Sequence, residues 1–414
     1  MKILIETLKR IYHLILPSGV RGRIRYFIFK QLRITGIINF LRKLGILTCN
    51  NQLQINVSNV EETFKSSNDC IRIYKMVEED AIKPAIHIEG QELDGMQPFI
   101  ARTETVVIDI AECGFSLRNN YLLDKDLNVV TECGIEFEKL AIYFHVLPKV
   151  NRVKGTVAYL SDPDLLNYYH WMCRTLPLLR IYQKCFERQE IDFFYVGQDP
   201  LANFHRETLA KAGVAMNQVI QEPCTADKII AAFNSRTVNY GDPISKEAYL
   251  FSKHLFYNVF DVNKRKHRIY VKRGNVKRRK VINESQIIVL LEKYGFEPVV
   301  MDNKTVQEQA EIFAQAEAIV APHGAALTNL LFIQPGVKVI ELIPYGYLNN
   351  CFYALASYGE AEYFYLEGEK IIQGNLEGRK LNRYVDVRYL NLYIDIQKLD
   401  QICQMASLSH FSVV

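Results

Sequence analysis

The stretch APHGAALTNLLFIQPGVKVIELIP, residues 321–344, overlaps twenty consecutive uncharged residues, 318–337, in a chain that otherwise carries charges every few positions. A membrane span needs about twenty predominantly apolar residues. This run contains two prolines, two glycines, a histidine, a threonine, an asparagine and a glutamine, so it must break into shorter elements. We predict a strand at 318–321, a loop at His323-Gly324, a helix at 326–333 and a strand at 337–342.

The same alternation extends upstream. We predict strands at 268–272, 296–301 and 316–322, with helices from Asn283 to Gly295 and from Thr305 onward. Both helices start with a capping-box pattern, because Gln286 and Glu308 follow the proposed caps by three residues. Short connections between alternating strands and helices indicate a parallel sheet covered on both faces. Ligands of such sheets bind beyond the carboxyl ends of the strands.

The first half is less regular. Residues 50–150 are mostly strand-like, and alternation starts near residue 154, with strands predicted at 155–162, 191–197 and 217–223 and helices at 163–187, 200–212 and 246–260. Two alternating segments predict an α/β protein with two Rossmann-like domains facing a cleft. We place the domains at 49–260 (acceptor side) and 261–414 (C-terminal, with its tail), preceded by a segment at 1–48.

Composition is that of a soluble globular protein of 414 residues with a net charge of +4. The nine cysteines form no CxxC pair and their number is odd. This usage favours a reduced, intracellular compartment, predicted here to be the cytoplasm, and argues against a zinc site.

The N-terminal 45 residues are strongly basic. They hold ten basic side chains against one acid, so they carry about +9 and leave about −5 for the rest of the chain. Apolar residues recur among them at helical spacing, which is typical of a helix on an anionic membrane surface. The alternative is a helical pair packed on the main body. No nucleic-acid-binding module accompanies the charge, so we expect no nucleic-acid partner.

A basic loop follows the strand at 268–272, in the sequence HRIYVKRGNVKRRK (267–280). Such a run is often a solvated surface loop, but the carboxyl end of a parallel strand is where ligands sit. Arginine suits forked contacts with phosphate, and Gly274 allows the backbone to approach closely. We therefore predict phosphate binding, with Arg273 and Arg278 as the principal residues.

The loop at His323-Gly324 has the small residues that let backbone amides approach an anion at a helix start. It is neither a P-loop nor a GxGxxG fingerprint. Glu341 ends the next strand, where a carboxylate suits two sugar hydroxyls. The predicted donor-side residues here are His323, Gly324, Ala325, Ala326, Thr328, Asn329 and Glu341.

A third motif is YLSDPDLLNYYHWMCRTLPLL, residues 159–179. Its polar and aromatic residues at helical spacing are candidates for the acceptor side: Asn167, His170, Trp171 and Arg174. Asp162 and Asp164 form a D-x-D pattern, which some glycosyltransferases use to hold Mn²⁺. We prefer to interpret Asp162 as the N-cap of a helix.

Three stretches together resemble glycosyltransferase family 61: NYYHW, RIYVKRG…KRRKVINE and PHGAALTNLLFIQPGVKVIELIP. The family includes plant xylan-decorating enzymes, eukaryotic O-linked N-acetylglucosaminyltransferases and bacterial proteins tied to capsular polysaccharide synthesis. The resemblance covers about residues 156–344 and is most specific in its last block.

The resemblance implies a two-domain GT-B architecture and inverting transfer from a nucleotide sugar to a glycan or lipid-linked glycan, without a metal or other cofactor. By position it implies donor binding by His323, Gly324, Asn329, Glu341 and the basic loop. His170 is the expected base, and Arg273 the residue expected to ease departure of the nucleotide. Many bacterial members have an acidic residue where this chain has Arg174, so a metal-dependent enzyme using Asp162 and Asp164, or a non-catalytic binding protein, are the alternatives.

Overall fold

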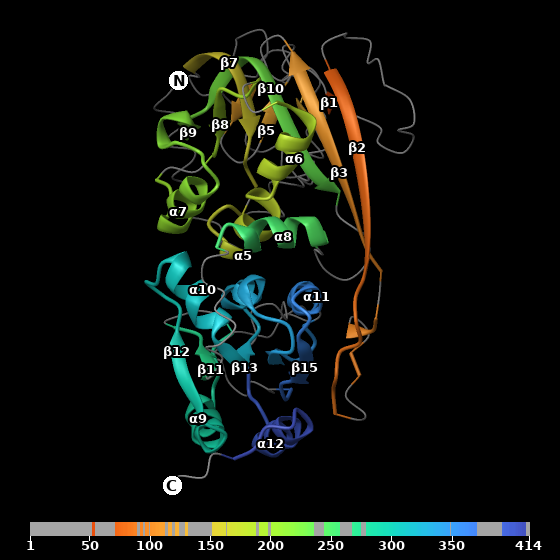
Figure 1. Ribbon diagram of the computed structural model, residues 1–414, viewed down its shortest axis with the longest axis vertical. Helices are drawn as coiled ribbons and strands as arrows, with labels where there is room; N and C mark the ends of the chain where they lie inside the picture. Colours follow the sequence, from red (N-terminus) through yellow and green to blue (C-terminus); the bar gives the residue numbers. More distant parts are fainter. Residues whose placement is uncertain are drawn as a thin grey trace, which may run out of the picture.

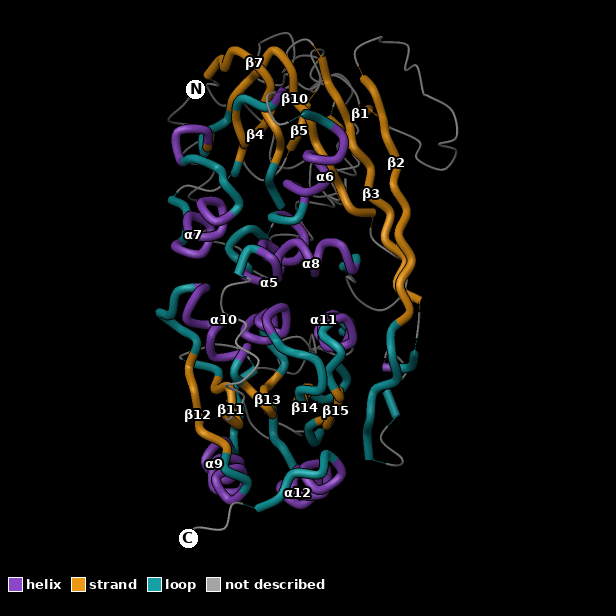
Figure 2. The backbone as a smooth tube through the Cα atoms, in the orientation of Figure 1, coloured by secondary structure: helices purple, strands orange, loops and turns teal. Residues whose placement is uncertain are grey.

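The computed structural model describes two β-sheets with their helices (Figures 1 and 2). The described residues are 52–53, 71–88, 92–93, 96–98, 100–111, 115–117, 121–123, 129–130, 151–162, 164–187, 190–197, 200–235, 244–256, 267–274, 279–347, 349–370 and 391–410. The basic segment 1–45 lies outside them, as does Arg278. Within these ranges, no helix has the length and apolar character needed to cross a bilayer.

The second lobe, residues 267–410, contains a five-stranded parallel sheet in the order β12-β11-β13-β14-β15. Its elements are β11 (His267–Lys272), α9 (Glu284–Lys293), β12 (Phe296–Val300), α10 (Val306–Ala314), β13 (Ala316–Pro322), the 3₁₀ helix η9 (Ala325–Phe332), β14 (Lys338–Ile343), α11 (Cys351–Tyr358), β15 (Glu362–Glu367) and α12 (Ile396–Met405). The predicted strand–helix alternation of this half is confirmed.

Helices cover both faces of this sheet. Tyr270 of β11 packs in a cluster with α9 and α12. Its neighbours Ile269 and Val271 point to the other face, where they join a cluster with α10, η9 and α11. This alternation is the period of two expected for a strand that is buried on both faces.

Two predicted caps had different outcomes. The Thr305 hydroxyl accepts from the Glu308 amide at 3.1 Å, and Glu308 accepts from the Thr305 amide at 2.7 Å, so the capping box of α10 is confirmed. Asn283 is the N-cap residue of α9, so the predicted helix start is confirmed, but its side chain makes no capping hydrogen bond and pairs instead with the backbone of Ile394, at 2.7 Å and 3.1 Å. It therefore ties α9 to the segment before α12.

The first lobe, residues 52–256, contains a ten-stranded mixed sheet. Strands β7 to β10 form its parallel part in the order β10-β7-β8-β9, and β10 also pairs antiparallel with β3 and β4. The strands are β1 (Gln52–Leu53), β2 (Ile71–Ala81), β3 (Ile100–Ala111), β4 (Phe115–Leu117), β5 (Tyr121–Leu123), β6 (Val129–Val130), β7 (Asn151–Tyr159), β8 (Phe193–Tyr195), β9 (Val219–Ile220) and β10 (Cys224–Ser235). The helices are α5 (Tyr168–His170), the π-helix η4 (Trp171–Thr175), α6 (Leu178–Cys185), α7 (Asn203–Lys211), the 3₁₀ helix η6 (Met216–Gln218) and α8 (Lys246–His254).

The helix predicted at 163–187 is divided. Asn167, not Asp162, is the N-cap, and its side chain accepts from the Tyr169 amide at 3.0 Å. The π-helix follows, with the Leu176 amide donating to the Trp171 carbonyl at 2.8 Å. Pro177 then starts α6, because proline is tolerated only at a helix start. Asp162 lies five residues before this cap, and its Oδ1 accepts from the Asp164 amide at 2.9 Å and contacts His170 Nδ1.

The two lobes share one apolar core. It joins residues of η4 and α8 to η9 and α11, and Phe256 packs edge-on against Phe332 at 5.2 Å between ring centroids. In Figure 1, α5 and α8 lie directly above α10 and α11. The carboxyl ends of the second lobe's strands face this junction, because β12 runs from α9 toward α10 (Figure 1).

The long antiparallel pair β2 and β3 runs along one side of the first lobe, and the segment after β2 continues beside the second lobe (Figure 2). Beyond β2, Ile86 pairs with the edge strand β15, donating to Tyr363 at 2.8 Å and accepting from Tyr365 at 3.1 Å. The segment after β2 therefore covers part of the sheet edge at β15, which would otherwise expose unpaired backbone groups.

Candidate functional site

The sheet of the second lobe has a topological switch point between β11 and β13. The chain leaves β11 toward β12 on one side, whereas β13 continues to β14 and β15 on the other. Arg273 directly follows β11, and His323 directly follows β13. Open α/β sheets bind ligands in the crevice at this point.

Arg273 and Gly324 are in close contact across the switch point. An Nη1 hydrogen of Arg273 is donated to the carbonyl oxygen of His323. A Cβ atom at position 324 would lie 2.2 Å from Arg273 Nη1. Glycine is therefore needed here for space, and the guanidinium is held against the loop that follows β13.

A second arginine, Arg279, lies in the same basic loop. Its guanidinium is 5.5 Å from the ring centroid of Tyr347, and its backbone is in the left-handed region with φ 55°. The Nε atoms of Arg273 and Arg279 are both buried without a hydrogen-bond partner. Burial and the charge of Arg279 lower the pKa of Arg273 from 12.5 to about 10, which still leaves it cationic at neutral pH. Neither arginine has a carboxylate partner among the described residues.

His323 is held from behind by a buried carboxylate. Its Nδ1 lies 2.5 Å from Glu341 Oε1, and Glu341 Oε2 accepts from the Tyr363 hydroxyl at 2.6 Å. Burial and the charge of Glu341 raise the pKa of Tyr363 well above 10, so Tyr363 is the donor. Glu341 is fully buried, so in this arrangement its carboxylate orients His323 and does not face a ligand.

The segment after Gly324 is a helix, as predicted, and it is of the 3₁₀ type. Asn329 lies at its centre: it accepts from the Tyr168 hydroxyl at 3.1 Å and donates to Gln309 at 2.8 Å. This asparagine therefore links the NYYHW motif of the first lobe to α10. The Thr328 hydroxyl is buried without a partner, whereas Ala325 is exposed beside Gly324.

The polar residues of the NYYHW region form a second cluster. His170 Nδ1 lies 3.2 Å from Asp162 Oδ1, and Arg174 Nη2 lies 3.7 Å from Asp162 Oδ2. Burial acts to raise the pKa of Asp162, but the hydrogen bond with His170 and the charge of Arg174 outweigh it, so this pKa is below 3.8. Asp162 is thus an ionised carboxylate that holds one ring nitrogen of His170.

The two clusters meet through Phe352. Its ring lies 5.5 Å from Tyr169 and 4.9 Å from His323, between centroids. Trp171, by contrast, is fully buried and donates from Nε1 to the Thr208 hydroxyl at 2.8 Å. Its side chain packs within the core and is not presented to the junction.

Sequence reasoning did not single out several members of these clusters. Arg279 belongs to the basic run, but nothing in that run separated it from Arg278. Tyr347 and Tyr363 carry no local pattern, since only sheet pairing and the turn after β14 bring them to His323. In the sequence, the D-x-D pattern suggests a metal site or a helix start for Asp162, and it does not indicate the contact with His170.

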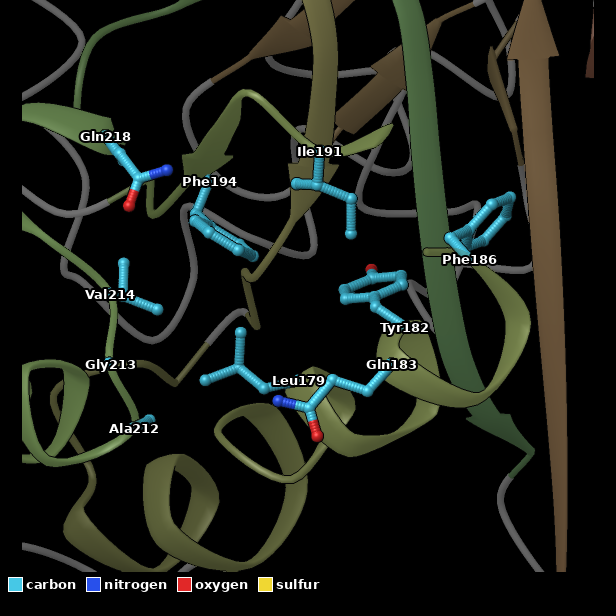
Figure 3. Close-up of a pocket in the computed structure, with 10 residues that line it drawn as sticks. All are labelled: Leu179, Tyr182, Gln183, Phe186, Ile191, Phe194, Ala212, Gly213, Val214 and Gln218. Carbon is cyan, nitrogen blue, oxygen red and sulfur yellow. The ribbon is translucent and has the colours of Figure 1, made fainter. Parts of the chain in front are cut away.

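A separate apolar pocket of about 120 Å³ lies in the first lobe (Figure 3). Leu179 and Tyr182 of α6, Phe194 of β8 and Val214 after α7 point into it. No charged residue or histidine lines it, so it does not offer the acid–base or phosphate chemistry found at the switch point. Within the described ranges, no group of three histidine, cysteine or acidic side chains is placed to bind a metal ion.

These features define an α/β protein with parallel strands, in which Arg273 and the His323-Gly324 loop meet at a switch point. Residues 168–340 match the family model described as Glycosyltransferase 61. The match contains residues 168–171 of the NYYHW motif and the loop after β13, and it indicates a glycosyltransferase. No curated protein matches the chain.

Proposed function

We propose that the protein is an inverting glycosyltransferase that moves a sugar from a nucleotide sugar, UDP-linked, to a hydroxyl of a glycan or lipid-linked glycan. The observation that carries the proposal is the pair of cationic arginines without carboxylate partners beside the His323-Gly324 loop. A diphosphate supplies the negative charge that these two half-buried guanidiniums lack, through charge-assisted hydrogen bonds.

In this proposal the cations also serve the chemistry. As the bond between the anomeric carbon and the diphosphate breaks, negative charge develops on the leaving oxygen. Arg273 and Arg279 stabilise that charge from positions fixed before the reaction. Glu341 acts as a positioning residue, since it sets the orientation of His323 beside the same loop.

His170 is the proposed general base. With Nδ1 held by Asp162, Nε2 is the nitrogen left to take the proton of the acceptor hydroxyl as it attacks the anomeric carbon. The acceptor then enters from the first lobe, beside Arg174. This arrangement requires no metal, and Asp162 is already engaged by His170 and Arg174, which weighs against the D-x-D alternative.

The setting follows from the resemblance and is proposed with it: synthesis of a capsular or other cell-surface polysaccharide in the cytoplasm, at the inner face of the membrane. Residues 1–45, outside the described part, would provide the basic contact with anionic lipid. The two-domain GT-B arrangement, with residues 49–260 on the acceptor side and 261–414 on the donor side, belongs to the same proposal.

The test is calorimetric binding of UDP, GDP and their sugars to the full chain, with and without EDTA. We expect one nucleotide class to bind equally well in EDTA, and Arg273→Ala to weaken it about ten- to a hundredfold, the range for lost hydrogen bonds to a charged group. Arg206→Ala removes an exposed arginine of α7 and should leave binding unchanged. With an acceptor, Arg273→Ala should lower kcat more than it raises KM for the acceptor.

Three results would contradict the proposal in different ways. Absence of nucleotide binding by the folded protein would overturn it. Binding that requires Mn²⁺ and is lost in Asp164→Asn would favour the metal-dependent alternative. Tight binding without transfer to any acceptor would favour a non-catalytic role in polysaccharide assembly.

A further inference from the structure

Asp302 lies at the switch point but belongs to neither cluster described above. It follows β12, the strand beside β11, in a turn where the Lys304 amide donates to the Met301 carbonyl at 3.2 Å. Asn303, with φ 65°, takes the left-handed conformation in that turn. The turn therefore fixes where the Asp302 side chain leaves the backbone.

The carboxylate of Asp302 lies against Gly274. Its Oδ2 is 1.9 Å from the point where a Cβ atom at position 274 would be. Glycine at 274 thus leaves room for a carboxylate in the same way that Gly324 leaves room for the Arg273 guanidinium. From β12 toward β13, the carboxyl edge of the sheet presents Asp302, Gly274, Arg273 and Gly324 in that order.

Asp302 is exposed, and within the described part of the chain it has no hydrogen-bond or ion-pair partner. Asp302 lies against Gly274, which is next to Arg273 in the chain. Because a carboxylate repels phosphate, we expect Asp302 to meet a neutral group that is rich in hydrogen-bond donors. In a nucleoside diphosphate, the ribose diol is the group of that kind adjacent to the phosphates, and it is the pair of sugar hydroxyls that the sequence assigned to Glu341. Glu341 cannot serve it in this arrangement, because it is fully buried behind His323.

We propose that Asp302 binds the ribose hydroxyls of the nucleotide and makes the site selective for ribonucleotides. The strand after the phosphate-binding loop carries the acid with this task in Rossmann dinucleotide sites, and β12 is that strand here. The inference rests on the proposed nucleotide-sugar function. It replaces Glu341 with Asp302 as the ribose ligand.

The test compares UDP with its 2′-deoxy and 3′-deoxy analogues in calorimetric titrations of the full chain. The wild-type protein should prefer UDP to at least one deoxy analogue by about tenfold or more, the value of a hydrogen bond to a charged group. In Asp302→Asn this preference should fall to within about twofold. Titration with pyrophosphate should show no loss in the variant, because the phosphate contacts remain.

Two further variants make the result specific. Gly274→Ala places a Cβ atom where the carboxylate lies, so it should displace Asp302 and reduce the ribose preference while Asp302 is still present. Glu297→Gln removes an exposed acid at the other end of β12 and should keep the wild-type preference.

Three outcomes would contradict the inference or the proposed function. If the wild-type protein binds UDP and Asp302→Asn keeps the full preference over both deoxy analogues, the inference is wrong and the donor site stands. If Asp302→Asn weakens a UDP-sugar but not UDP, Asp302 contacts the transferred sugar and the ribose assignment is wrong. If the wild-type protein binds neither UDP nor GDP, the proposed function fails and this inference with it.

Discussion

Asp162 and His170 show how one carboxylate can define the role of a neighbouring histidine. Nδ1 of His170 lies 3.2 Å from Asp162, which leaves Nε2 as the nitrogen proposed to take the acceptor proton. Asp162→Asn keeps the shape but lets the amide favour the wrong tautomer. We expect kcat for transfer to fall about a hundredfold, within the range for a general base, with KM for the donor unchanged. Steady-state kinetics should be compared with Asp164→Asn, an exposed neighbour that should retain activity.

The same substitution has a signature in stability that does not depend on catalysis. Since the pKa of Asp162 lies below 3.8 in the folded protein, its stabilising contribution is present above about pH 4 and is lost as pH falls through the lowered value. Asp162→Asn should therefore be less stable by about 1–2 kcal/mol at pH 7, and this difference should shrink in urea unfolding at pH 3. A difference that stays constant with pH would contradict the ionised pair.

At the scale of elements, the second lobe was readable from sequence because its signals are local. Strands buried on both faces are continuous apolar runs, and Gly295 and the Thr305–Glu308 box mark helix ends without reference to the rest of the fold. The His323-Gly324 loop was located for the same reason. The 3₁₀ geometry of the segment after this loop was not predicted. Asn329 contacts α10 and the first lobe, and tertiary contacts of this kind leave no local pattern.

The first lobe could not be read to the same depth. Strand β10 pairs parallel with β7 and antiparallel with β3, and a strand sequence does not state the direction of its partners. The position of the Asp162 side chain depends on its contact with His170, eight residues away. The position of the Glu341 side chain depends on its contact with His323 on the neighbouring strand end. Such pairings are fixed by register and burial, so candidate residues could be proposed but their division into binding and positioning roles could not.

Glu207 provides a link between elements of the two lobes. Its carboxylate, on α7, accepts from the amides of Val306 and Gln307, both at 2.8 Å, and so caps the start of α10. Glu207→Gln removes the charge that favours a helix N-terminus and should lower the free energy of unfolding by about 1 kcal/mol. Chemical denaturation should show this loss, whereas Glu292→Gln, exposed on α9, should be neutral. An equal effect in both variants would remove the capping role.

At the scale of the whole molecule, the shared apolar core determines how the lobes behave. A core that is continuous across two sheets makes the unfolding of either lobe expose apolar surface of the other. Phe332 belongs to the second lobe but packs against Phe256 of the first, and both are fully buried. This arrangement favours one cooperative unit over two lobes that unfold independently.

The only tryptophan makes this cooperativity measurable. Trp171 is fully buried in the first lobe, so its fluorescence reports that lobe alone, while hydrogen exchange in β13 and β14 reports the second. Phe332→Ala should cost about 3–5 kcal/mol as a core truncation and should move the Trp171 transition in urea by the same free energy as the exchange of β13 and β14. Ile402 of α12 packs on the face of the second sheet that is away from the shared core. Ile402→Ala should also move both the Trp171 transition and the exchange of β13 and β14. If Phe332→Ala changes exchange in the second lobe but leaves the Trp171 midpoint in place, the lobes unfold separately.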